Sequence, residues 1–193
     1  MKTDFHKNFI KVKSRTSTKY IVVHCSATQN KHEIDWKTID RMHRENGWLM
    51  CGYHYVIKTD GTIQNGRDRE AIGAHVSGFN DCSIGICLVG GVDSKSKPID
   101  NFTDEQKEAL AQLLLELKHF YPNAVIQGHR DFEGVSKDCP CFDVKKWMEK
   151  HCKLVPYAKG ELPAIFAKYD LSKDIFEALN PNFNDTSRFV RVR

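Results

Sequence analysis

The chain has 193 residues, which is enough for one ordinary domain and a small second module. Hydrophobic residues make up 40% of the sequence, as in a soluble globular protein, and the modest formal net charge of +4 does not indicate a nucleic-acid partner. No run of about 18 apolar residues is present to span a membrane, and we expect no secretory signal because the basic N-terminus lacks an apolar stretch.

The hydrophobic pattern predicts strands and helices in alternation, and hence an α/β fold with a mixed central β-sheet flanked by helices. The predicted elements are, in chain order, a strand over residues 19–24, a helix over 35–45, a hairpin of strands over 53–58 and 62–64, a strand over 83–89, a helix over 103–120, a strand over 125–127 and a helix over 143–150.

Local residues predict where several of these elements begin and end. Thr103 and Gln106 fit a capping box at the start of one helix, and Asn46-Gly47 ends another. Asp60-Gly61 is suited to the positive φ angles of a tight hairpin turn. The near-continuous apolar run over residues 83–89 is typical of a central strand that is buried on both faces.

The cysteines are odd in number, which argues against a disulfide scaffold. We expect the chain to fold in the cytosol, where thiols stay reduced. The seven are Cys25, Cys51, Cys82, Cys87, Cys139, Cys141 and Cys152. Cys87 lies inside an apolar run and is predicted to be a buried strand thiol.

Three residues with soft metal-ligating side chains lie at or after the ends of predicted strands. His24 ends the first strand, His129 follows residues 125–127, and Cys139 lies ten positions further along the same loop. Neutral imidazole and thiolate bind zinc, and a catalytic zinc site uses three protein ligands and an open position. Taken alone, each residue also fits an ordinary structural role, so the residues by themselves leave both interpretations open.

Four ordered runs carry a family resemblance. They are V-H-C-S-A-T (23–28), G-W-L-M-C-G-Y-H-Y-V-I-K-T-D-G-T-I (47–63), S-I-G-I-C-L-V-G-G-V-D (83–93) and K-D-C-P-C-F-D-V-K-K-W (137–147). Together they resemble the phage amidase lysozymes, which are zinc N-acetylmuramoyl-L-alanine amidases related to the peptidoglycan recognition proteins. The resemblance extends over about residues 20–150 and supports a catalytic domain over residues 19–152.

The resemblance implies a role for each matched residue. His24, His129 and Cys139 would be the zinc ligands, and Tyr53 and Lys137 the two further catalytic groups. Lys137 would stabilise the oxyanion that forms during amide hydrolysis, and Tyr53 would orient or deprotonate the attacking water. His75 occupies a position at which the family lines its substrate cleft.

Two features depart from the family pattern. Cys141 places a second thiol two residues after Cys139, and we expect Pro140 to direct it away from the metal. The loop between His129 and Cys139 is longer than in the family, which changes one wall of the cleft.

The composition of residues 1–18 predicts a basic N-terminal tail, because this segment contains several lysines and Arg15 but only one acidic residue, Asp4. A solvated tail is the favoured interpretation, and contact with peptidoglycan, teichoic acid or nucleic acid is the alternative. In the resembling lysozymes the N-terminal tail belongs to a contact that inhibits the phage RNA polymerase. The tail of this chain does not match, so that role is not transferred.

Residues 153–193 lie beyond the amidase resemblance. They predict a strand over 154–157, a helix with Ile165 and Phe166, a second helix with Ile175 and Phe176, and a last strand over 188–193. This small β-α-α-β module and its run I-F-A-K-Y-D-L-S-K-D-I-F-E-A-L-N-P-N resemble LysM modules, although 160–162 replaces their usual G-D-T turn. The resemblance implies a glycan anchor. The alternative is an extension that packs on the catalytic domain and only stabilises it.

The resemblance implies a monomeric zinc peptidoglycan hydrolase that cleaves the amide between N-acetylmuramic acid and L-alanine. We expect a phage or prophage endolysin that stays in the cytoplasm until lysis. A delivered antibacterial amidase toxin, a non-catalytic peptidoglycan-binding protein, a Cys-His hydrolase with Cys139 or Cys25 as nucleophile, and a polymerase inhibitor remain as alternatives.

Overall fold

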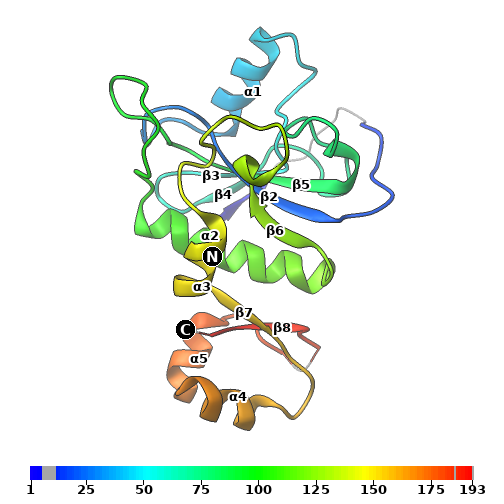
Figure 1. Cartoon of the computed structure of the whole chain (residues 1–193), viewed down its shortest axis with the longest axis vertical. Coiled ribbons are helices and arrows are strands. Elements are labelled where there is room, and N and C mark those ends of the chain that lie inside the picture. The colour runs from blue at the N-terminus through cyan, green and yellow to red at the C-terminus, as the bar shows by residue number, and fades with distance from the viewer. Residues whose placement is uncertain (6–11, 185, 193) are drawn as a thin grey trace.

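The computed structural model describes residues 1–5, 12–184 and 186–192, and it has the predicted mixed α/β fold (Figure 1). The central sheet has the strand order β1-β4-β3-β5-β2-β6. Strands β3 and β4 pair antiparallel, and the other neighbours run parallel. The strands are β1 (Thr3–Asp4), β2 (Tyr20–Cys25), β3 (Tyr55–Ile57), β4 (Ile63–Asn65), β5 (Ser83–Leu88) and β6 (Val125–Gly128).

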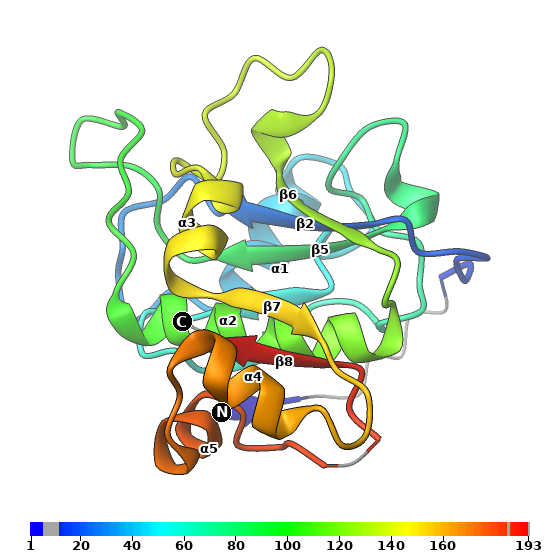
Figure 2. The same cartoon turned by 60° about the horizontal axis from the view of Figure 1, so that its bottom comes forward.

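Helices cover both faces of this sheet. α2 (Asp104–Phe120) lies across one face, α1 (Trp36–Glu45) lies on the other, and α3 (Val144–His151) follows β6 (Figures 1 and 2). Among the described residues, no helix combines the length and the apolar character that crossing a membrane requires.

The main core lies between the sheet and α2, because alternate residues of a strand point to the same face. Its fully buried side chains include Ile21, Val23, Ile84, Ile86, Leu110, Leu113, Leu114 and Leu117. Strand β5 lies inside the sheet and all its residues are buried, as its apolar run predicts. The same alternation directs His24, which follows Val23, to the face opposite α2.

The start of α2 is fixed as the sequence predicts. The Thr103 hydroxyl accepts a hydrogen bond from the Gln106 backbone N–H, and the Gln106 side chain accepts one from Thr103 N–H. The Gln106 amide also donates to the carbonyls of Ile57 and Val89, so the cap ties the helix to the sheet. In the hairpin turn Gly61 alone of the predicted pair has a positive φ, of 77°.

The segment predicted as a basic tail is partly built into the domain. Thr3–Asp4 forms β1 and pairs with β4. The Arg15 side chain is buried and donates to the carbonyl oxygens of Arg69 (2.7 Å) and Ala71 (2.8 Å). The prediction of a solvated tail is therefore wrong for these residues. Composition alone suggests that Arg15 is exposed to solvent, but backbone carbonyls accept the hydrogen bonds of its guanidinium and allow it to be buried. Lys7 and Lys11 lie outside the described residues.

The C-terminal module has the predicted strand-helix-helix-strand order and its own core. Strands β7 (Lys153–Pro156) and β8 (Phe189–Val192) pair antiparallel, and α4 (Leu162–Tyr169) and α5 (Lys173–Leu179) lie between them in sequence. Its core comprises Val155, Tyr157, Ile165, Leu171, Phe176, Val190 and Val192. The module packs beneath α2, on the far side of the sheet from α1 (Figure 1).

Candidate functional site

Two histidines meet because they lie at the carboxyl ends of neighbouring parallel strands. His24 is the penultimate residue of β2, and His129 comes directly after β6, where a short 3-10 helix (His129–Asp131) begins. Val23 pairs with Gly128 across these strands, so the residues that follow emerge at the same edge of the sheet. The two imidazole rings have centroids 4.6 Å apart.

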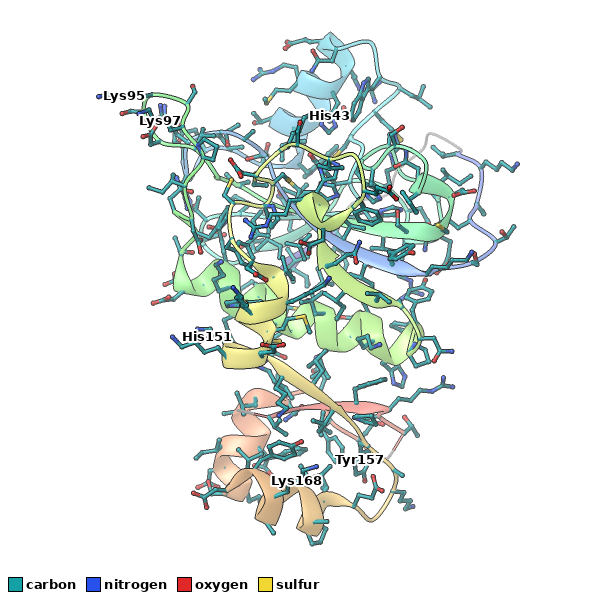
Figure 3. The ribbon with its side chains drawn as sticks, in the orientation of Figure 1. His43, Lys95, Lys97, His151, Tyr157 and Lys168 are labelled. Atoms are coloured by element: carbon teal, nitrogen blue, oxygen red, sulfur yellow. The ribbon has the colours of Figure 1, made fainter. Side chains whose placement is uncertain are left out.

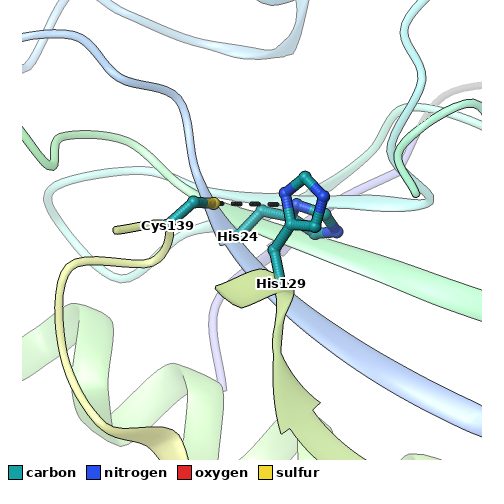
Figure 4. A group of neighbouring side chains, drawn as sticks. All are labelled: His24, His129 and Cys139. Atoms are coloured by element: carbon teal, nitrogen blue, oxygen red, sulfur yellow. Dashed lines mark hydrogen bonds between the residues drawn. The ribbon is translucent and has the colours of Figure 1, made fainter. Parts of the chain in front are cut away.

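Cys139 joins the two histidines from the following loop. Its Sγ is 3.7 Å from His24 Nδ1, and the ligand atoms of all three residues lie within 4.8 Å of one another (Figure 4). The backbone N–H of Cys25 donates to Cys139 Sγ at 3.2 Å. Gly128 permits the close approach of the loop, since an added Cβ there would lie 2.9 Å from Pro140 Cδ.

The chemistry of this group fits a zinc ion. Burial holds the pKa of His24 well below its usual value, and repulsion from His129, when that ring is protonated, and from the Lys137 ammonium lowers it further. Burial and the ammonium of Lys137 also lower the pKa of His129. Both rings are therefore neutral near pH 7, which is the form that binds metal. Two imidazoles and a thiolate are ligands of catalytic zinc sites, which leave one position open for water or substrate.

A cleft of about 440 Å³ opens beside this group and includes His129. Lys137 lies on its wall with an exposed side chain. Trp48, which is 43% exposed, lies on the cleft as well. The remaining lining residues are Ala74, His75, Val76, Ser77, Asn80, Gly134, Val135 and Ser136. A molecule in this cleft would contact Lys137 and a metal ligand at the same time.

Tyr53 lies next to the ligand group, just before β3. Its ring centroid is 5.1 Å from that of His24. Burial raises the pKa of Tyr53 well above its ordinary value, and repulsion from nearby cysteines such as Cys87 and Cys139, in their thiolate form, acts in the same direction. Its hydroxyl therefore keeps its proton in the metal-free protein.

His75 borders the cleft but is only 8% exposed, and its ring faces inward. Its Nδ1 lies 3.0 Å from His24 Nε2. The structure thus brings His75 to the cleft wall, where the sequence places it, and adds a direct contact with a metal-ligand candidate that the sequence did not indicate.

Cys141 is turned away from the three ligand atoms. Its Sγ donates to the Gly91 carbonyl at 3.1 Å and lies 3.7 Å from Cys25 Sγ. This agrees with the expectation that the residue after Pro140 does not compete for the metal.

Two further histidines that the sequence did not indicate lie around the site. His43 of α1 accepts a hydrogen bond from Gly52 N–H at 2.9 Å, and its ring packs beside Tyr53 (Figure 3). His54 is fully buried, and its Nδ1 accepts from Gly85 N–H at 2.9 Å. The alternation Tyr53-His54-Tyr55 indicates that His54 points to one face of the sheet, but only the fold shows its partners.

Comparisons with known proteins indicate the family to which the chain is similar. A family model described as N-acetylmuramoyl-L-alanine amidase matches residues 14–142. The endolysin of Klebsiella phage KP32 is 48% identical over 137 residues, which are 71% of this chain and 89% of that protein. The endolysin of Escherichia phage T7 is 46% identical over 151 residues, which are 78% of this chain and 98% of that protein.

Solved structures show the same fold. The N-acetylmuramoyl-L-alanine amidase LysC from Clostridium intestinale URNW superposes with a TM-score of 0.66 at 26% identity and covers 78% of this chain and 97% of its own. The C-terminal module lies outside the family match, which ends at residue 142. With a family model over most of its length and relatives above 40% identity, the chain belongs to the N-acetylmuramoyl-L-alanine amidase family.

Proposed function

We propose that this chain is a zinc-dependent peptidoglycan hydrolase that acts as a phage endolysin. It cleaves the amide bond between N-acetylmuramic acid and the L-alanine of the stem peptide. The observation that carries this proposal is the convergence of His24, His129 and Cys139 beside an open cleft. The family match and the endolysin relatives support the reaction and the role.

The three ligand residues would hold the ion, which when bound supplies a Lewis acid that acidifies a water and polarises the amide carbonyl. Lys137 contributes a cation on the cleft wall, near the position at which negative charge develops on the amide oxygen. Tyr53 contributes a hydroxyl that keeps its proton, so we assign it a hydrogen-bond donor role that orients the reacting groups. Exposed Trp48 adds an aromatic surface to the cleft lining that a substrate can contact.

Three observations favour this proposal over the alternatives. A complete set of three ligands supports an enzyme over a non-catalytic peptidoglycan-binding protein. The curated relatives named endolysins support a lysis role over a delivered toxin. A Cys-His hydrolase is less well supported, because Cys139 lies within one ligand group with two histidines whose rings are held neutral.

Digestion of purified peptidoglycan tests the reaction. Mass spectrometry of the products should find stem peptides with a free L-alanine amino group and glycan strands whose lactyl groups are intact. A chelator should abolish the activity and added zinc should restore it. Cleavage within the glycan, cleavage within the peptide, or activity that persists without metal would contradict the proposal.

The C-terminal module supports a second proposal, that it binds the glycan strand of the same polymer. A groove of about 330 Å³ lies between α2 and the segment that joins α5 to β8. The rings of Phe120, Phe183 and Phe189 and the polar side chains of Glu116 and Asn182 line it. Aromatic surfaces beside a few polar groups suit a small ligand such as a sugar ring. The module and His43 of the site lie at opposite ends of the molecule, so an anchor there leaves the cleft free (Figure 3).

Point variants test the anchor better than removal of the module. The side chain of Arg191 pairs with Glu108 of α2 at 2.6 Å and donates to the carbonyl of His151, so truncation would also disturb the catalytic domain. Phe120→Ala combined with Asn182→Ala should reduce co-sedimentation with insoluble peptidoglycan and leave hydrolysis of soluble muropeptides unchanged. Lys168→Ala, on α4 outside the groove, is the matched control. Sedimentation equal to that of the unaltered chain would refute the anchor.

A further inference from the structure

A chain of hydrogen bonds leads from His24 away from the ligand group into the domain. His24 Nε2 lies 3.0 Å from His75 Nδ1, and His75 Nε2 lies 3.4 Å from the Ser83 hydroxyl. The Ser83 hydroxyl donates to the carbonyl of Phe79 at 2.6 Å. His24, His75 and Ser83 are each less than a tenth exposed, so water does not compete freely for these groups.

We infer that His75 and Ser83 are positioning residues that hold His24 in the tautomer and the orientation required for metal binding. The inference rests on the proposed zinc site and adds to it the residues that set the chemical form of one ligand. Ligating histidines commonly depend on such a partner at their second ring nitrogen.

The carbonyl of Phe79 determines which group donates and which accepts in each hydrogen bond of this series. A carbonyl only accepts, so Ser83 uses its single proton on Phe79 and offers a lone pair to His75. His75 therefore carries its proton on Nε2 and presents an unprotonated Nδ1 to His24. His24 must then carry its own proton on Nε2.

The consequence appears at the other nitrogen of His24. With the proton on Nε2, Nδ1 holds a free lone pair, and this is the atom that lies 3.7 Å from Cys139 Sγ. The opposite tautomer would direct an N–H at the metal position and leave two lone pairs facing each other between His24 and His75. Neither of these buried lone pairs would then have a hydrogen-bond donor, which disfavours that tautomer.

The surroundings of His75 hold its ring in place. A Cβ added to Gly85 would lie 2.6 Å from His75 Cγ, and one added to Gly73 would lie 2.4 Å from His75 Cδ2. The backbone N–H groups of His75 and Val76 both donate to the Asn80 side-chain oxygen, at 2.7 and 3.0 Å. Two glycines thus make room for the ring, and Asn80 fixes its backbone, as expected for a position whose side-chain direction matters.

Two substitutions of His75 separate hydrogen bonding from packing. His75→Leu replaces the ring with an apolar side chain of similar size and removes the hydrogen-bond acceptor that faces His24 Nε2. His75→Asn places an amide oxygen near the position of Nδ1. We expect His75→Leu to weaken zinc binding by about 10–100-fold, measured by competition with a chromogenic chelator, and His75→Asn to recover most of that loss. His43→Leu is the control, because His43 packs on Tyr53 and Trp48 rather than on His24.

A readout that needs no metal tests the tautomer directly. Long-range ¹H–¹⁵N spectra of the metal-free full chain should show the proton of both His24 and His75 on Nε2. In Ser83→Ala, we expect His75 to populate both tautomers, because its Nε2–H loses its acceptor. A proton on His24 Nδ1 in the unaltered chain would overturn the inference, as would unchanged zinc affinity in a folded His75→Leu variant. If the unaltered chain binds no zinc, the proposed function fails instead, and the tautomer spectra still decide the inference.

Discussion

The two faces of the central sheet are built from the same strands, and both bury apolar side chains, but only the face away from α2 also buries histidines. The face toward α2 buries aliphatic residues such as Ile21 and Leu114, which need no hydrogen-bond partner. The opposite face buries the rings of His24, His54 and His75. Burial of a polar ring costs free energy unless its nitrogens are paired, and here each of the three has at least one partner.

This difference implies that mutations on the two faces should change different properties, namely stability on one face and metal binding on the other. Because side chains alternate along a strand, adjacent residues contribute to different properties. Substitutions on the α2 face should lower the free energy of unfolding and leave the metal affinity of the folded protein unchanged. Substitutions of the buried histidines on the other face should change the chemistry of the site first.

The largest effect is expected on the α2 face. Leu114→Ala removes a fully buried side chain from the main core and should destabilise the protein by about 2–5 kcal/mol. Urea unfolding of the metal-free chain measures this loss. Zinc affinity of the folded fraction should stay unchanged, and a drop as large as that of His75→Leu would break the separation between the faces.

The histidine face should make the stability of the metal-free protein depend on pH. Burial lowers the pKa of His24 and His75 well below the usual value and that of His54 to about 3. The unfolded chain therefore binds more protons once the pH falls below about 6.5, the usual histidine value, and stability is lost as the pH falls. Thermal unfolding with chelator present should show a lower midpoint at pH 5.5 than at pH 7.5. Equal midpoints would show that these rings are not held neutral.

Lys137 lies on the cleft wall with an exposed side chain, so we expect it to contribute little to the stability of the fold. Lys137→Ala should slow turnover by about 100-fold, the effect of losing one group that stabilises the oxyanion. Zinc content and the unfolding midpoint should not change, since the side chain is exposed. Lys168→Ala is a matched control in the module and should retain full activity on soluble muropeptides. A loss of zinc in Lys137→Ala would assign this residue a structural role instead.

A helix cap on the α2 face gives the smallest effect. Thr103→Ala removes the side-chain acceptor for Gln106 N–H and should cost about 1 kcal/mol. The midpoint of chemical denaturation measures it, and hydrolysis rates should be equal to those of the unaltered chain. Thr103→Ser, which keeps the hydroxyl, should restore most of the stability.

Much of the fold follows from local patterns in the sequence. The capping box at Thr103, the apolar run of β5 and the β-α-α-β order of the module each depend on residues near one another in the chain, and the structure has all of them. The three ligand candidates could be named because each lies in a motif that resembles the family's. The parallel pairing of β2 with β6 then brings His24 and His129 together, whereas the approach of Cys139 depends on the loop that follows β6.

Contacts between distant segments could not be predicted in the same way. Arg15 is buried because the carbonyls of Arg69 and Ala71 receive it, and no pattern near Arg15 indicates those partners. The contact of His75 with His24 depends on how the loop before β5 folds back over β2. Tertiary structure determines the hydrogen-bond partners of buried polar groups. The sequence therefore indicated His75 as a site residue but did not indicate its contact with His24.

Zinc content tests the central claim most directly, because two neighbouring thiols give opposite predictions. The unaltered chain should bind one zinc ion, Cys141→Ser should bind the same amount, and Cys139→Ser should bind none at equal protein concentration. The reason is geometric, since Cys139 Sγ belongs to the ligand group and Cys141 Sγ points at the Gly91 carbonyl. Zinc retained in Cys139→Ser, or lost in Cys141→Ser, would contradict the account.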